Sequence, residues 1–249
     1  MKIQPIRATI AATVLALALF PINLQAQPIY SSGHADIGVG YAAGEFEPHW
    51  HLHSGAIVGG NPIAADEEYA PADLIAQVQA TRLSPSGLQS IIGVTDGNTI
   101  FVMGSSAFQP NLGFGAEELV PADWTTPITL TLTGWTLPGG AQFALYTTNL
   151  AGTSVVDRVF STFNGAATDF SNSFQMTPGD HVHFQWGFTE VGDYALELTW
   201  SGTHAMDGPI STTENFTVQV VPEPSTVFML GLGAVGFLLL LRRRARLSN

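Results

Sequence analysis

The sequence predicts an all-β protein, an antiparallel β-sandwich of Ig-like or jelly-roll-like type with short helical insertions. Three observations lead to this prediction. Segment 126–135 alternates Ile128, Leu130 and Leu132 with threonines, which is the period of a half-buried strand. Clusters of Gly, Pro, Asn and Asp separate it from further segments of this kind, as turns do. The clearest helix candidate, 71–79, is short and has a proline near its first turn.

The later elements follow one another at short intervals. After 126–135, the sequence predicts strands at 142–148, 154–163, 173–176, 181–188, 194–200 and 215–221. Turn residues separate them at 137–140, 164–165, 177–180, 191–193 and 207–209. Short strands at this spacing are typical of an antiparallel sandwich.

The amino terminus has the pattern of an export signal. Lys2 and Arg7 precede an apolar run at 8–20, and a small residue, Ala26, stands where a signal peptidase would cut. We therefore expect a signal peptide at 1–26. The alternative is a first transmembrane helix, but the run is shorter than the roughly 20 apolar residues that a span needs, and Pro21 ends it.

The carboxyl terminus has three parts. Pro-Glu-Pro at 222–224 precedes an uncharged, mostly apolar segment at 227–241, and an arginine cluster follows. This order predicts a transmembrane helix at 227–241 with a basic tail on the cytoplasmic side. Segment 222–249 resembles the PEP-CTERM sorting signal, which implies processing by an exosortase after transient anchoring in the inner membrane. The resemblance implies delivery to the cell surface, the outer membrane or the extracellular matrix. The alternative is an ordinary membrane anchor.

Between the two ends, residues 27–221 form one predicted domain of unusual charge. The chain of 249 residues has 8 basic and 20 acidic residues and a mean hydropathy of +0.22. This composition disfavours an acidic disordered tail and a nucleic-acid-binding protein. Arg82 and Arg158 are the domain's basic residues against 19 acidic ones, a net charge of −17 that attracts cations. The chain has no Cys, so neither disulfides nor thiolate ligands are available.

Histidines carry the candidate chemistry. His49, His51 and His53 alternate with apolar residues, so on a strand their imidazoles share one face. His181 and His183 repeat this pattern, and Asp36 follows His34 at the same spacing. Imidazole and carboxylate are the ligands that Zn²⁺ takes where thiolate is absent. The sequence therefore predicts a metal site drawn from these seven residues, whereas the isolated His204 is interpreted as a surface or hydrogen-bonded histidine and not as a ligand.

Geometry limits how the histidines can share an ion. Three alternating histidines span roughly 13 Å of strand, at about 3.3 Å per residue, which is too long for one ion. Two of them with one or two ligands from elsewhere give a better geometry. We expect His34, His49, His51, His181 and His183 to approach one another, with Asp36 as a ligand or as a partner that orients an imidazole.

A second resemblance covers most of the predicted domain. The opening His34-Ala35-Asp36-Ile37, the His-x-His at 49–51 and the segment 181–189 followed by Gly192 and Tyr194 resemble the Zur-repressed PEP-CTERM family and the related choice-of-anchor M domains. The family's polar positions correspond to His34, Asp36, His49, His51, His181 and His183, whereas His53 is an addition. The chain departs from the family at Leu52, where an acidic residue is common, and at Gln185, where Asn is common. The resemblance implies a surface protein that is made under zinc limitation and binds or retains zinc.

Three functions are compatible with the residues. The first is a zinc-binding surface protein without enzymatic activity. The second is a structural or adhesive matrix protein, which would have its histidine clusters on separate faces. The third is a zinc hydrolase with Glu45 or Glu47 as base, although the chain has none of the common hydrolase motifs. Trp186, Phe188 and Tyr194 are interpreted as core aromatics.

Overall fold

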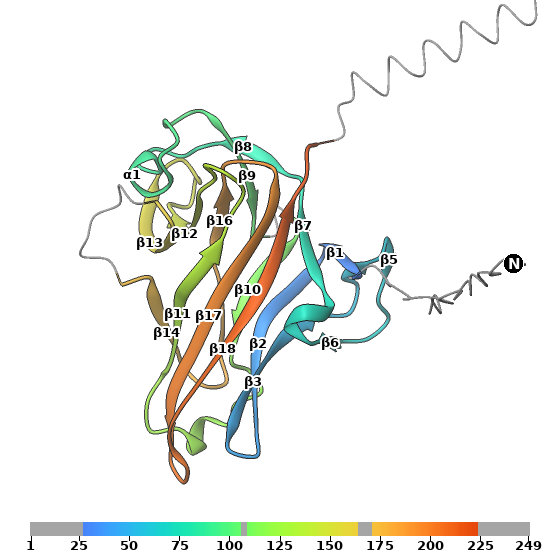
Figure 1. Ribbon diagram of the computed structural model, residues 1–249, viewed down its shortest axis with the longest axis vertical. Helices are drawn as coiled ribbons and strands as arrows, with labels where there is room; N and C mark the ends of the chain where they lie inside the picture. Colours follow the sequence, from blue (N-terminus) through green and yellow to red (C-terminus); the bar gives the residue numbers. More distant parts are fainter. Residues whose placement is uncertain (1–26, 106–108, 164–170, 224–249) are drawn as a thin grey trace, which may run out of the picture.

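The computed structural model describes residues 27–105, 109–163 and 171–223. Strands dominate them, so the all-β prediction is confirmed (Figure 1). The predicted signal peptide at 1–26, the predicted turn at 164–165 and the predicted membrane helix and basic tail lie outside these ranges. Within them, no helix has the length and hydropathy of a membrane span.

The described strands form three hydrogen-bonded sheets. In spatial order, sheet A contains β14 (Ser173–Met176), β11 (Ile128–Thr136), β17 (Gly192–His204), β18 (Gly208–Val220), β7 (Ile75–Val78), β1 (Ile29–Ser32), β4 (Ile57–Val58) and β5 (Asn61–Pro62). Sheet B contains β15 (His181–His183), β10 (Asn111–Gly115), β2 (His34–Ala42), β3 (Glu45–Leu52) and β6 (Glu67–Tyr69). Sheet C contains β13 (Val155–Ser161), β12 (Phe143–Thr148), β16 (Gln185–Phe188), β9 (Thr99–Met103) and β8 (Thr81–Leu83). The helices are η1 (Pro71–Asp73), α1 (Gln89–Ile92) and η2 (Pro121–Asp123).

Buried aromatic side chains hold the sheets together. Trp50 of β3 meets Phe216 of β18 edge to face, with ring centroids 5.0 Å apart, so sheets A and B pack as a sandwich. Trp186 of β16 stacks on Phe114 of β10 at 5.3 Å and joins sheet C to the same core. The three aromatics predicted for the core are fully buried, which confirms that interpretation: Trp186, Phe188 and Tyr194.

The antiparallel prediction holds for sheet C and needs correction for sheets A and B, which are mixed. Strand β10 pairs in parallel with β2, and β7 pairs in parallel with both β1 and β18. Turn sequences specify only the pairs that are adjacent along the chain, such as the β17–β18 hairpin. Parallel partners are joined by long connections, so no local signal announces them.

The helix predicted at 71–79 is wrong beyond its first turn. Only η1 is helical, and Leu74 is already extended with φ −140° and ψ 151°. Strand β7 follows between β1 and β18. Leu74, Ala76 and Val78 are buried at a period of two, so pairing on both sides outweighs the weak local preference for a helix.

The strand predicted at 181–188 is two strands. β15 pairs with β10 in sheet B, whereas β16 pairs with β12 and β9 in sheet C. The chain changes sheets at Phe184, whose carbonyl oxygen would lie 2.2 Å from a Cβ at Gly104. Gly104 has φ +95°, so this crossing depends on a glycine.

The remaining strand predictions hold, with shifted ends. Strands β11, β12, β13 and β14 correspond to the predictions at 126–135, 142–148, 154–163 and 173–176. β17 and β18 are longer than predicted, since each has 13 residues, and they include residues of the predicted turns at 191–193 and 207–209. Taken alone, the glycine and proline residues at these positions indicate turns. Antiparallel pairing along the full length of β17 and β18 includes them in the strands.

Candidate metal centre

One face of sheet B carries the predicted site residues. β2 and β3 are antiparallel, with Asp36 opposite His51, and β10 pairs with β2 on its other side. Strand β15 completes the order with His183 opposite Gly113. A single row therefore crosses all five strands of the sheet: His183, Gly113, Asp36, His51 and Glu68.

Alternation separates this face from the core. Ile37, Trp50 and Leu52 point into the sandwich and are fully buried. Their neighbours along the strands point to the opposite side. We call that side the histidine face and define it by the seven predicted residues: His34, Asp36, His49, His51, His53, His181 and His183.

Glycines make room for the imidazoles. A Cβ at Gly113 would lie 2.3 Å from Asp36 Oδ1 and 2.8 Å from His183 Cε1, although the backbone there is ordinary. A Cβ at Gly38 would lie 2.8 Å from His49 Nε2. These glycines are required by space, because side chains from neighbouring strands lie across them.

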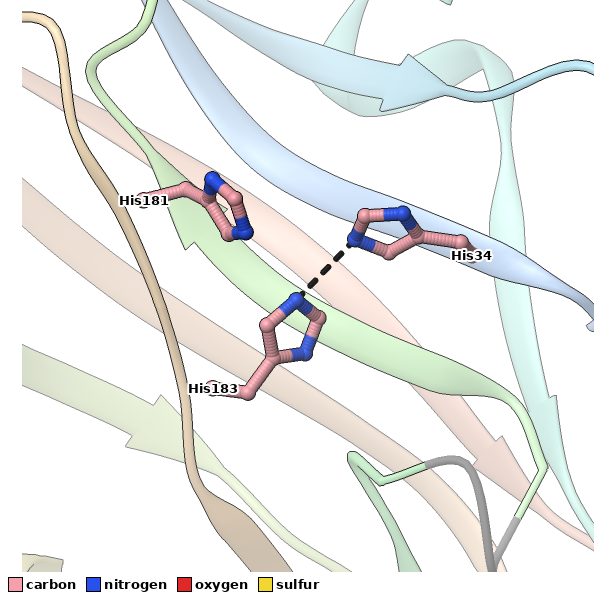
Figure 2. Close-up of side chains that lie close together, drawn as sticks. All are labelled: His34, His181 and His183. Carbon is pink, nitrogen blue, oxygen red and sulfur yellow. Dashed lines mark hydrogen bonds between the residues drawn. The ribbon is translucent and has the colours of Figure 1, made fainter.

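His34, His181 and His183 form what we call the nitrogen-rich end of the face. The Nε2 atoms of His34 and His183 lie 3.0 Å apart, so the N–H of one ring donates a hydrogen bond to the nitrogen of the other (Figure 2). One nitrogen from each of the three rings lies within 4.8 Å of the other two. Figure 2 shows the three rings converging from β2 and β15 on one point.

Asp36 is the buried anion of the face. Its side chain is 1% exposed, and its Oδ2 lies 3.2 Å from His53 Nε2 and 3.4 Å from His34 Nε2. Its Oδ1 is buried without a hydrogen bond and lies 3.7 Å from His183 Nε2. A buried carboxylate oxygen without a donor is costly, so this atom favours a cation beside it.

His49, His51, Glu68 and Glu118 form what we call the carboxylate end. Glu118 Oε1 lies 2.8 Å from His49 Nε2 and 3.2 Å from His51 Nδ1. The Nδ1–H of His49 donates to the carbonyl of Glu47 at 2.9 Å, which turns Nε2 toward the carboxylate. This backbone contact fixes the ring as it does for metal-bound histidines.

Asp66 and His53 connect the two ends. His53 stacks on His34 with centroids 4.2 Å apart and lies 4.9 Å from His51. Asp66 Oδ2 lies 3.5 Å from His53 Nδ1. The backbone N–H of Ser54 donates to Asp66 Oδ1 at 2.8 Å and lowers the pKa of that carboxyl, which stays ionised beside the rings.

Burial keeps two of the histidines neutral. Desolvation lowers the pKa of both His34 and His183, and it outweighs the attraction of Asp36, which acts in the opposite direction. Neutral imidazole is the form that binds metals. His34 and His183 are therefore in the form that binds metals near neutral pH.

The structure places the seven predicted residues on one face of sheet B, but His49 and His51 form a group apart from His34, His181 and His183, so these five do not converge on one point as expected. It also reveals four residues that the sequence analysis missed. His204 lies apart from them, with its Nδ1 2.7 Å from Asp207 Oδ2 and its ring against Tyr41. The missed residues are carboxylates that approach the histidines from loops and from β6: Asp66, Glu68, Glu117 and Glu118. The available signal was two acidic runs, 66–68 and 117–118, in a chain that is only 11% charged.

The comparisons with known proteins identify a sorting motif near the carboxyl terminus. Residues 220–244 match the PEP-CTERM protein-sorting motif. The motif begins at the end of β18, where Val221 N–H donates to Val78 O at 2.9 Å and Glu223 accepts hydrogen bonds from Thr81. No curated protein and no solved structure matches the chain. The motif indicates an exported protein that an exosortase processes and delivers to the cell surface or the extracellular space.

Proposed function

We propose that this chain is a zinc-binding protein of the cell surface and that its histidine face holds the ion. The observation that carries the proposal is the convergence of His34, His183 and Asp36. The two Nε2 atoms are 3.0 Å apart, and a buried carboxylate oxygen lies 3.7 Å from one of them.

The spacing suits a tetrahedral ion. Two Zn–N bonds of about 2.0–2.1 Å at a tetrahedral angle place the nitrogens roughly 3.3 Å apart. The nitrogens of His34 and His183 need to separate by only a few tenths of an ångström to reach that value. His181 offers a third nitrogen and completes a three-histidine set without thiolate, and Asp36 Oδ1 lies beside it, 3.7 Å from His183 Nε2.

The placement of the histidines on a single face favours metal binding. It argues against a structural matrix protein whose histidines only solvate a sheet. A matrix protein that only needed solvated strands would have no reason to place its histidines against one another around a buried Asp36. Here adjacent rings lie 4.2–6.1 Å apart. The acidic domain around them raises the local concentration of cations.

The donor arrangement favours retention of metal over hydrolysis. Glu45 and Glu47, the candidate bases of a hydrolase, contribute no atom to any His/carboxylate group in the described residues. Combined with the sorting motif and the resemblance to Zur-repressed surface proteins, this supports a role at the cell surface when zinc is scarce. The protein would bind or retain Zn²⁺ there.

Competition with a chromophoric chelator tests the proposal on the full chain, purified in detergent. The His183→Ala variant should weaken zinc binding by more than the roughly 10- to 100-fold that the loss of an outer-shell partner costs. His204→Ala is the matched control, because its ring lies outside the histidine face, and it should bind zinc like the wild type. Equal zinc affinity of the wild type and His183→Ala would refute the proposal.

A further inference from the structure

We infer that the histidine face holds two ions, one at the nitrogen-rich end and a second at the carboxylate end. This inference rests on the proposed function and adds a separate site of different donor chemistry. The second site uses His49 and His51 from β3, Glu68 from β6 and Glu118 from the loop after β10.

The two ends are too far apart to serve one ion. Ligand atoms 2.0–2.2 Å from a shared zinc can be at most about 4.4 Å from one another. Among the described residues, no group of mutually close donors combines His183 with His49. Their strands β15 and β3 are separated by β10 and β2, and neighbouring strands are about 4.8 Å apart.

Glu117 and Glu118 divide between the two ends. Glu117 Oε1 lies 2.8 Å from His181 Nδ1, whereas Glu118 Oε1 lies 2.8 Å from His49 Nε2. Consecutive residues thus supply one carboxylate to each group of histidines. A single site would need only one of them.

A small cavity adjoins the second site. It has a volume of about 10 Å³, and two ligands of that site, His51 and Glu118, line it together with Asp36 and Glu117 of the other end. That volume corresponds to about one water-sized sphere. The remaining lining is small or apolar and includes Gly38 and Gly115, so the space is open because those strands carry no side chain there.

The residues between the ends offset the repulsion of two cations. Asp36 lies at the nitrogen-rich end and also lines the cavity between the two ends. Asp66 contacts His51 and His53 from the solvent side. Two carboxylates therefore stand between the positions. The nitrogen-rich end suits Zn²⁺, Cu²⁺ or Ni²⁺, whereas the oxygen ligands make the carboxylate end the weaker and more exchangeable zinc position.

Counting bound zinc tests the inference. The full chain in detergent is dialysed against buffered Zn²⁺, and the ions per chain are measured by elemental analysis and native mass spectrometry. Wild type should bind two ions. A Glu68→Gln, Glu118→Gln double variant should bind one, and so should a His181→Ala, His183→Ala double variant. A Glu45→Gln, Glu47→Gln double variant removes the same charge from exposed positions of β3 and should still bind two.

The outcomes separate the inference from the proposed function. One ion in the wild type, lost in the histidine variant and kept in the glutamine variant, would overturn the second site and leave the proposed function intact. Loss of all zinc in both double variants would overturn the inference in favour of one shared site. No zinc in the wild type would overturn both. Circular dichroism of each variant confirms that it is folded.

Discussion

The Nε2 atoms of His34 and His183 lie 3.0 Å apart, although 149 residues separate the two histidines along the chain. The contact exists because β2 and β15 flank the same strand, β10. Strand β10 has Gly113 opposite both His183 and Asp36, so no side chain there blocks the approach of His183 to β2. The nitrogen-rich end therefore depends on the order of the strands in sheet B.

Gly113→Ala should weaken zinc binding without unfolding the protein. The new methyl group would meet Asp36 Oδ1 at 2.3 Å and His183 Cε1 at 2.8 Å, so both groups must move. We expect about a 10- to 100-fold loss of zinc affinity, as for other displaced ligand partners. Chelator competition measures it.

Gly139→Ala is the control for this substitution. A Cβ at Gly139 would meet no atom within 4 Å, and its φ is not in the left-handed region. Its zinc affinity should equal that of the wild type. An affinity of Gly113→Ala that also equals the wild type would show that the ion binds away from Asp36 and His183.

Zinc affinity should fall on acidification, but at a lower pH than for a site made of histidines with unperturbed pKa values. Protons compete with metal for imidazole, and an unperturbed histidine has a pKa of about 6.5. Burial lowers the pKa of His34 and His183, so these rings stay neutral, and able to bind, to more acidic pH. The charged or titratable groups that face them are Asp36, His53, Glu117 and His181.

Dialysis against buffered free zinc between pH 5 and 8 checks this prediction. Affinity at the nitrogen-rich end should be nearly constant above pH 6.5 and should decline below it. A decline that is already complete at pH 6.5 would contradict the assignment of neutral, buried imidazoles to this site.

Zinc should stabilise the folded chain. Because the two histidines and Asp36 converge only in the folded state, an ion that binds there raises the free energy of unfolding. At free zinc 100-fold above the dissociation constant, the increase is about 2.7 kcal/mol for one site. Thermal unfolding with zinc, with EDTA and with Mg²⁺ measures it. Equal melting temperatures in zinc and EDTA would argue against binding to the folded form.

Trp186 should contribute strongly to the stability of the hydrophobic core on which sheet B packs. It is fully buried, stacks on Phe114 and donates from Nε1 to Leu112 O at 3.1 Å. Trp186→Ala should lower the free energy of unfolding by about 3–5 kcal/mol. Trp135 is 42% exposed, so Trp135→Ala should change it by no more than about 0.5 kcal/mol. Chemical denaturation of both variants compares them, and similar losses would contradict this account of the core.

The sequence predicts the local features of the fold and misses the long-range ones. Alternation and turn residues locate β11, β12 and β14 to within a few residues. They fail at β7, where pairing with two distant strands replaces the helix that was predicted to continue after Pro71. They also fail at Phe184, since nothing in its neighbourhood indicates that the chain changes sheets there.

The candidate site shows the same division. The spacing of the histidines predicts that rings on one strand share a face, and the structure places all seven predicted residues on one face of sheet B. Glu118 could not be assigned from the sequence, because its contact with His49 depends on where the loop after β10 lies. Gly113 also gives no signal of its own, since its role is to leave space for side chains of neighbouring strands.

Crystallography of the zinc-loaded protein with anomalous diffraction at the zinc edge tests the central claim most directly. The account predicts an anomalous peak about 2.0–2.1 Å from the Nε2 atoms of both His34 and His183. Zinc-saturated crystals with no peak on the histidine face, or with a peak only at His204, would contradict it.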